Sequence, residues 1–321
     1  MSHINPNAGV KAAEIFYPLE FVDCKGIMEL THIEIKQDMP GFNGFLGAWL
    51  CRGPVTLLVD VGPANTAGRL VETLDSMGID RVDFILITHI HIDHAGAVSD
   101  LAEHYPMARV IAHEKGIKFL RDPTKLWAGS LKVLGATAEA YGPPKPVKEE
   151  KLIPHTQGNI PGLTIIETPG HAAHHLSFTY QDHLFSGEAG GNYFRVGDNE
   201  YLRPATPPRF FLEVFLRSVD RLLGLKNQTI CYAHFGMAPD SHRLLKRFRE
   251  QLIRWKKIIS EQIRANNGRL VDRCMAALLE QDPELVAFEQ MDPDVQNREK
   301  IFLTNSINGF IEFLREGADG G

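Results

Sequence analysis

The chain has 321 residues, of which 44% are hydrophobic and 23% are charged, and its formal net charge is −6 at pH 7. This composition is typical of a globular protein with a substantial core. It argues against a nucleic-acid binder that relies on overall basicity, because phosphate contacts require clustered Lys and Arg. No apolar run approaches the roughly 18 residues of a membrane span, and the N-terminal stretch lacks the apolar segment of a secretory signal. We therefore expect a cytoplasmic protein with neither a membrane nor a nucleic-acid partner.

Short apolar runs of β type alternate with helical stretches between about residues 14 and 233. Turns rich in Gly, Pro and Asp separate the runs, as is usual between strands. Helices are expected at Thr66–Met77 and at Pro208–Leu225. This alternation predicts a layered α/β domain, which we assign to residues 1–240.

Beyond about residue 240 the strand signals stop, and apolar residues recur at steps of three and four. That spacing predicts one buried stripe along a helix. The two stripes are Leu245, Phe248, Leu252, Trp255, Ile259 and Ile263, and then Leu303, Ile307, Phe310 and Leu314. We predict a helical extension over residues 241–321 that acts either as a lid over the active site or as a dimer element. A homodimer is therefore one of the possible assemblies.

Residues 242–264 of this extension are rich in Lys and Arg. We interpret them as the solvated basic face of a helix that packs on the core. The alternatives are a helix that borders the active site and attracts a phosphate-bearing substrate, or one that binds a membrane surface or a partner.

The cysteines at positions 24, 51, 231 and 274 are widely scattered, with no C-x-x-C spacing. Neither a disulfide framework nor a thiolate zinc site is therefore indicated, and we expect buried, inert thiols. Among the isolated histidines, His113 is expected to precede or cap a helix, and His104 and His155 are expected at the surface.

The stretch LITHIHIDHAG places four metal-capable side chains within six positions: His89, His91, Asp93 and His94. An apolar run at Phe84–Thr88 comes before them and a helical pattern follows, so they occupy a strand-to-helix turn. In an extended segment alternate side chains share a face, so His89, His91 and Asp93 can converge while His94 faces differently. Burying these groups without a metal would leave unpaired polar atoms costing about 1–3 kcal/mol each. The geometry suits a pair of metals better than one.

Three later strand ends supply further candidate ligands. His171 follows an apolar run in a Pro-Gly turn, Glu188 follows another run in HLFSGEAGG, and His234 ends the run TICYAH. Each lies beside a glycine, which permits close approach of the backbone.

The H-x-H-x-D-H motif, followed in order by T-P-G-H, F-S-G-E and A-H-F-G, resembles the metallo-beta-lactamase superfamily over about residues 45–236. The resemblance implies a four-layer αββα sandwich with a dinuclear metal site, to which the extension is added. It implies one metal held by His89, His91 and His171, a second held by Asp93, His94 and His234, and a bridging carboxylate at Glu188. Zinc is the expected metal, with iron or manganese as alternatives, because imidazole and carboxylate ligands accept all three.

The chain departs from the family pattern at Glu188, where relatives usually have Asp. Glutamate keeps the charge and adds one methylene, so it could bridge both metals or bind only one. His175 is interpreted as a structural neighbour of the ligands, and Asp60 in L-V-D-V-G as a residue that orients the ligand loop, since ligating histidines need a partner for their other ring nitrogen. Tyr193 and Phe194 are expected either to line the substrate pocket or to pack in the core.

Counting charges predicts the substrate class. Two divalent cations, two carboxylates and one hydroxide leave the centre with a net charge of about +1, which favours a small anionic substrate. A metal-bound water has a pKa near about 7, so hydroxide is available to attack a carbonyl. Asp93 would orient this hydroxide and return a proton to the leaving group. We therefore expect a hydrolase of thioesters, esters or lactones, in line with the glyoxalase II, thioesterase and lactonase members that the sequence resembles.

Two other activities of the superfamily stay open as alternatives. A phosphodiesterase or nuclease would also use a dinuclear site, although no inserted RNA-binding domain is evident. A mononuclear-iron oxidoreductase of the persulfide dioxygenase type is compatible with the same ligands. A binding protein without turnover is disfavoured, because every expected ligand position is filled, and fold alone does not choose among these activities.

Overall fold

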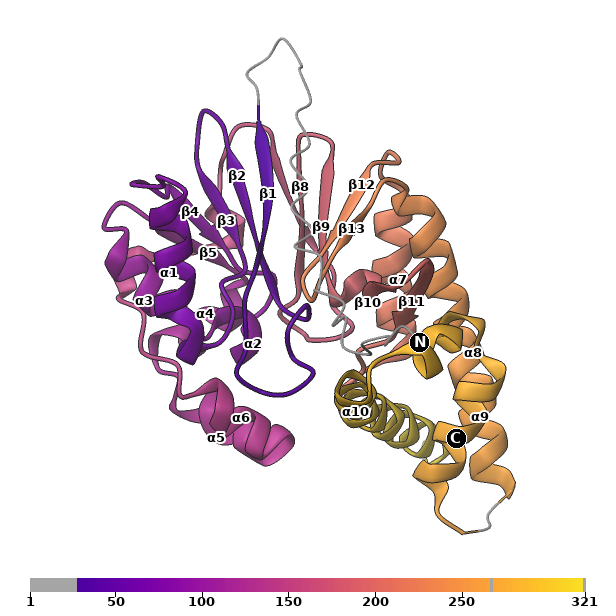
Figure 1. Ribbon diagram of the computed structural model, residues 1–321. Coiled ribbons are helices and arrows are strands. Elements are labelled where there is room, and N and C mark those ends of the chain that lie inside the picture. Colours follow the sequence, from indigo (N-terminus) through magenta and orange to yellow (C-terminus); the bar gives the residue numbers. More distant parts are fainter. Residues whose placement is uncertain (1–27, 266–267, 320–321) are drawn as a thin grey trace, which may run out of the picture.

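The computed structural model describes residues 28–265 and 268–319 and has four layers (Figure 1). Two β-sheets lie face to face, and helices cover the outer side of each sheet. This is the αββα arrangement expected from the sequence, with a helical C-terminal region added. Within the described residues, no helix is both long enough and apolar enough to cross a membrane.

The first sheet is mixed. Its strands lie in chain order: β1 (Glu29–Glu34), β2 (Gly47–Arg52), β3 (Leu57–Val59), β4 (Phe84–Leu86), β5 (Arg109–Ala112) and β6 (Leu152–Pro154). The pairs β1–β2 and β2–β3 are antiparallel, whereas β3 to β6 are parallel. The carboxyl ends of β3 to β6 therefore meet at one edge of the sheet.

The second sheet has the order β13 (Met237–Ala238), β12 (Thr229–Tyr232), β9 (His183–Gly187), β8 (Leu176–Tyr180) and β7 (Leu163–Glu167). Strands β12 and β9 are parallel and their neighbours are antiparallel. A separate hairpin, β10 (Asn192–Val196) and β11 (Asn199–Arg203), follows β9. A core that includes Trp49, Leu86, Phe178 and Phe185 fills the space between the two sheets.

Ten α-helices and several short 3-10 turns lie within the described residues. The helices of the first half are α1 (Ala67–Ser76), α2 (Ile92–Ala95), α3 (Val98–His104), α4 (Glu114–Arg121), α5 (Thr124–Leu134) and α6 (Ala136–Tyr141). Those of the second half are α7 (Leu212–Leu223), α8 (Ser241–Ala265), α9 (Leu270–Gln281) and α10 (Pro293–Asp319). The 3-10 turns are η1 (Ala64–Thr66), η2 (Glu149–Lys151), η3 (His155–Gln157), η4 (Glu188–Gly190) and η5 (Pro283–Gln290). The two helices expected at residues 66–77 and 208–225 are confirmed with shorter ends.

The C-terminal helices share one core with the second sheet. Phe248 and Trp255 of the α8 stripe and Phe310 of the α10 stripe are fully buried together with Phe215 of α7. The expected start of the extension coincides with the start of α8 at Ser241. Since its apolar face packs on the α/β layers, the extension and these layers share one hydrophobic core.

The basic face of α8 is largely neutralised by neighbouring carboxylates. Arg243 and Arg247 both pair with Glu200, and Arg247 also pairs with Glu284. Arg249 pairs with Asp220 and Arg254 with Asp282. These pairs favour the packing interpretation of this helix over attraction of a phosphate-bearing substrate, because four of its five arginines already face a carboxylate.

The cysteines in the described part of the chain fit the expected inert thiols. Cys51, Cys231 and Cys274 are buried and free. Burial raises the pKa of the Cys274 thiol to about 11. The remaining cysteine, Cys24, lies outside the described residues.

Candidate metal centre

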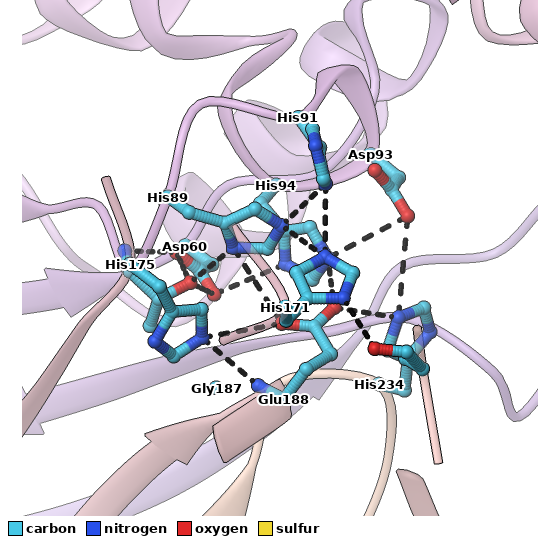
Figure 2. Close-up of polar contacts among 12 residues, drawn as sticks. Asp60, His89, His91, Asp93, His94, His171, His175, Gly187, Glu188 and His234 are labelled. Atoms are coloured by element: carbon cyan, nitrogen blue, oxygen red, sulfur yellow. Dashed lines mark hydrogen bonds and ion pairs between the residues drawn. The ribbon is translucent and has the colours of Figure 1, made fainter. Parts of the chain in front are cut away.

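The candidate ligands gather where strands of both sheets end (Figure 2). His89 follows β4 and His171 follows β7, while Glu188 and His234 follow the parallel pair β9 and β12. Because β9 and β12 run in the same direction, their ends bring Glu188 and His234 to the same place. Residues more than 140 positions apart in the sequence thus meet in one cluster.

Asp60 fixes the loop that carries the H-x-H-x-D-H motif. Its carboxylate accepts hydrogen bonds from the Thr88 backbone N–H at 2.9 Å and from the Thr88 hydroxyl at 2.8 Å. The other contact joins Asp60 Oδ2 to His94 Nδ1 at 3.1 Å. Asp60 has a φ of 53°, in the left-handed region that non-glycine residues rarely adopt. A strained backbone at a buried carboxylate with three partners agrees with the orienting role expected for Asp60.

His89, His91 and His171 point three ring nitrogens at one another. His91 Nδ1 lies 2.9 Å from His89 Nε2 and 2.9 Å from His171 Nε2, and the two Nε2 atoms are 3.2 Å apart. His171 Nδ1 donates to the Ala205 carbonyl at 2.8 Å, so its Nε2 carries a lone pair. The three nitrogens are therefore close enough to share one cation.

The tautomer of His89 leads to the same conclusion. Its Nδ1 lies 3.1 Å from the Thr88 hydroxyl oxygen, whose own hydrogen goes to Asp60. The Thr88 oxygen therefore accepts from His89 Nδ1, and His89 Nε2 is left free for a metal. Burial is the main cause that lowers the pKa of His89, His91 and His171, which keeps these rings neutral and able to ligate.

Asp93, His94 and His234 form a second group next to the first. Asp93 Oδ2 lies 3.5 Å from His94 Nε2 and 4.0 Å from His234 Nε2. His94 lies between carboxylates, with Nδ1 3.1 Å from Asp60 Oδ2 and Nε2 2.8 Å from Glu188 Oε1. Burial opposes protonation, but Glu188, Asp93 and Asp60 raise the pKa of His94 well above its ordinary value. His234 differs from the other ligands, since its Nδ1 is buried without a partner in the described part of the chain and its ring packs on Phe45 at 4.5 Å.

Glu188 lies between the two groups (Figure 2). Its Oε1 is 2.8 Å from His94 Nε2 and 2.9 Å from His234 Nε2, while its Oε2 is 3.5 Å from His89 Nδ1. The residue is 1% exposed. Burial opposes ionisation, but His89 and His94 outweigh it and hold the pKa of Glu188 well below its ordinary value. The longer glutamate side chain thus reaches the position at which the family pattern usually has aspartate.

His175 is placed as a positioning residue. Its Nε2 accepts from the Glu188 backbone N–H at 3.1 Å, and its Nδ1 faces the Thr168 hydroxyl at 2.9 Å. Both ring nitrogens are engaged, so neither has a lone pair for a metal. Gly187 has a φ of 53°, and a Cβ there would lie 2.4 Å from His175 Nε2, so only glycine fits between this ring and the Glu188 turn.

Of the two roles expected for Tyr193 and Phe194, pocket lining and core packing, the contacts of both residues support packing. The Tyr193 ring stacks on Tyr232 with centroids 5.1 Å apart, and its hydroxyl donates to Glu200 at 3.0 Å. Phe194 packs on Tyr201 at 4.9 Å. Both are buried in the core that joins the second sheet to the C-terminal helices, so packing is the role that their contacts support.

A further cluster of His113, His155 and Glu167 was not anticipated from the sequence. His155 was expected at the surface and is buried, whereas His104 is exposed as expected. His113 and His155 follow the neighbouring parallel strands β5 and β6. Because parallel neighbours end at the same sheet edge, the positions of these two strands could have predicted that the two histidines meet. Ligand atoms of the three residues lie within 4.8 Å of one another.

In this cluster the Nδ1 atoms accept hydrogen bonds from backbone N–H groups, whereas in the metal centre His171 Nδ1 donates to a carbonyl oxygen. His113 caps α4 as expected, and its Nδ1 accepts from the Lys115 backbone N–H at 3.1 Å. His155 Nδ1 accepts from the Glu114 backbone N–H at 3.2 Å, and its Nε2 lies 3.1 Å from Glu167 Oε1. In each neutral ring the proton is therefore on Nε2, which leaves no lone pair for a metal.

Comparison with known proteins gives a consistent result. The family model described as "Metallo-beta-lactamase superfamily" matches residues 52–234. A metallo-beta-lactamase fold-containing protein of Sulfurisphaera tokodaii is 31% identical over 219 residues, which are 65% of this chain and 78% of the relative. A hydroxyacylglutathione hydrolase of Photobacterium profundum is 27% identical over 68% of this chain and 77% of its own length.

Solved structures support the same fold. The archaeal metallo-beta-lactamase superfamily protein from Sulfolobus tokodaii superposes with a TM-score of 0.59 at 27% identity, covering 82% of this chain and 99% of the other. A metallo-beta-lactamase family protein from Thermus thermophilus reaches a TM-score of 0.61 at 21% identity, covering 90% and 94%. The second likeness concerns the fold alone.

Proposed function

Because the chain belongs to the metallo-beta-lactamase superfamily, whose members are mostly metal-dependent hydrolases, we propose that it is a dinuclear-metal hydrolase that cleaves a thioester, ester or lactone. The observation that carries the proposal is the convergence of one ring nitrogen each from His89, His91 and His171. A second group of possible ligands, Asp93, His94 and His234, lies directly beside them.

Two divalent cations, most simply zinc, fit this donor set. His89, His91 and His171 would hold one, Asp93, His94 and His234 would hold the other, and Glu188 would contact both. Iron and manganese are alternatives, because imidazole and carboxylate ligands accept them too. When bound, the cations supply an acidified water as nucleophile and a Lewis acid for the carbonyl oxygen.

Asp93 is proposed as the residue that handles protons. Its carboxylate is 14% exposed, whereas the side chain of Glu188 is 1% exposed, so Asp93 faces the open side of the centre. From there it can orient the attacking water and pass a proton to the departing thiolate or alkoxide. The two carboxylates do not balance two divalent cations, so the centre favours a small anionic substrate.

The thioester is the substrate class with the most support. Several relatives named hydroxyacylglutathione hydrolase are 27% identical over more than half of this chain. That name describes those proteins, and it makes an acyl-glutathione the first substrate to test here.

The test combines elemental analysis of the purified protein with turnover of four compounds: an acyl-glutathione, an acyl-coenzyme A, an acyl-homoserine lactone and a phosphodiester. About two zinc or manganese ions per chain with thioester or lactone cleavage are expected. Cleavage of the phosphodiester alone would favour a nuclease-type activity. About one iron per chain with oxygen uptake and no hydrolysis would contradict the proposal.

A further inference from the structure

The ring of His234 is held differently from the rings of the other candidate ligands. His89, His94 and His171 each direct Nδ1 at an oxygen atom, at 3.1, 3.1 and 2.8 Å respectively. His234 Nε2 lies 2.9 Å from Glu188 Oε1, but its Nδ1 is buried and makes no hydrogen bond with any described residue. A ligating imidazole usually has a hydrogen-bond partner at its other ring nitrogen, which fixes the orientation of the ring. Another contact therefore has to fix the His234 ring.

The ring of Phe45 makes that contact. The centroids of the Phe45 and His234 rings are 4.5 Å apart, with an angle of 44° between the ring planes. Both side chains are buried. The His94 ring also lies near His234, at 5.2 Å, but it belongs to another candidate ligand. Phe45 is therefore the part of the surrounding framework that packs directly against His234.

Phe45 is itself held by the C-terminal helix α10. The Arg298 guanidinium lies over the Phe45 ring at 4.2 Å, where the face of the ring attracts it, and the Phe302 ring is 5.1 Å away. Arg298 is buried and also donates a hydrogen bond to the Gly41 carbonyl, in the loop that leads to Phe45. Gly41 has a φ of 78°, and a Cβ there would lie 2.3 Å from the Asp294 carbonyl oxygen, so this loop touches the first turn of α10. Contacts between α10 and the loop thus determine where Phe45 lies.

We propose that Phe45 is a positioning residue for His234, and that α10 acts through it on the affinity of the second metal position. The proposal rests on the dinuclear centre proposed above. A hydrogen bond at Nδ1 fixes both the orientation and the tautomer of a ring, whereas packing fixes the orientation alone. The second position is therefore expected to bind its metal more weakly than the first, and to depend on contacts that α10 makes.

Removal of metal from the loaded protein by a chromophoric chelator tests the role of Phe45. The titration gives one dissociation constant for each bound ion, and the constant that is missing in His234→Ala belongs to the second position. Phe45→Leu is expected to weaken the second position about 10- to 100-fold and to leave the first unchanged, because only the second contains His234. Phe42→Leu is the matched control and should change neither constant, since Phe42 is also buried but packs on Phe45 and Tyr141.

A second pair of variants tests the part played by α10. Phe302→Leu removes the α10 ring that packs on Phe45 and is expected to weaken the second position about 3- to 10-fold. Phe313 lies on the same helix and packs on Phe210 at 5.4 Å, so Phe313→Leu should change neither constant. Thermal midpoints are measured for every variant, because each of these changes removes buried apolar contacts and is expected to lower the midpoint.

The outcomes separate this proposal from the proposed function. A wild type that binds two ions but cleaves none of the four compounds contradicts the hydrolase function, and the titration still decides the role of Phe45. An unchanged second constant in Phe45→Leu, equal weakening of both positions, or the same weakening in Phe42→Leu overturns that role. A single bound ion in the wild type overturns it too, because no second position would exist. If Phe45→Leu does not fold, Phe302→Leu compared with Phe313→Leu decides the question, and equal constants in these two variants overturn the proposal.

Discussion

Two groups of histidines and carboxylates meet at strand ends in this protein, the metal centre and the cluster of His113, His155 and Glu167. Both contain imidazoles whose ligand atoms lie within 4.8 Å of one another and of a carboxylate. In the metal centre, His171 Nδ1 faces a carbonyl oxygen and His94 Nδ1 faces a carboxylate. In the other cluster, the Nδ1 atoms of His113 and His155 face backbone N–H groups.

The difference shows that residue type and proximity are insufficient to make a metal site. An acceptor at Nδ1 puts the proton there and leaves Nε2 with a lone pair, whereas a donor at Nδ1 puts the proton on Nε2. The first arrangement leaves a lone pair that a cation can bind, and the second makes a hydrogen-bonded link between α4 and β7. Substitutions in matched positions of the two clusters test this distinction.

The largest effect is expected from Asp93→Asn. An amide cannot accept and return a proton, so kcat/KM on the cleaved compound should fall about 100- to 10,000-fold. The matched change Glu167→Gln should alter kcat/KM less than about 2-fold, because Glu167 is a half-exposed partner of His155 outside the centre. Steady-state kinetics of both variants, with metal analysis, is the measurement. Unchanged turnover in Asp93→Asn would refute its proton role.

The second-largest effect is expected in metal content, which should fall when a histidine of the metal centre is replaced and stay unchanged when a histidine of the other cluster is replaced. His171→Ala removes a proposed ligand and is expected to lower bound metal by about one ion per chain. His155→Ala should keep its metal and instead lose about 1–3 kcal/mol of unfolding free energy, because the Glu114 N–H loses its acceptor. Elemental analysis and denaturant unfolding give both values. Metal loss in His155→Ala would assign a ligand role to the second cluster.

A smaller effect is expected from Asp60→Asn. Asp60 accepts from two Thr88 groups and from His94 Nδ1, and an amide has only one acceptor oxygen for them. Metal affinity or activity should fall about 10- to 100-fold. A competition titration with a chromophoric chelator measures the affinity. Wild-type affinity would mean that the tautomer of His94 does not depend on Asp60.

The smallest effect is expected from His113, whose side chain caps α4. His113→Ala should cost about 1 kcal/mol of unfolding free energy, whereas His113→Asn should largely retain the cap, because asparagine is a preferred residue there. Thermal unfolding of the two variants, with metal content unchanged in both, is the check. A drop in metal content would remove the proposed distinction between the clusters.

Local patterns in the sequence predicted a layered α/β domain and the candidate ligands, and the resemblance to the superfamily implied the four layers and the division of the ligands between two metals. The stripes that include Phe248 and Phe310 are buried as expected, because a period near 3.6 predicts which face of a helix is apolar. The candidate ligands His89, His171 and Glu188 could be named because each lies within four residues of a strand end, and strand ends are readable from apolar runs and glycine turns.

Only the tertiary structure determined how these residues are used. The proton position on His171 depends on the Ala205 carbonyl, 34 residues away, and that on His155 depends on the Glu114 N–H, 41 residues away. A sequence pattern records which side chains are available and which faces are apolar. The partner of each ring nitrogen or hydroxyl is set by contacts between distant segments, which form only when the chain folds.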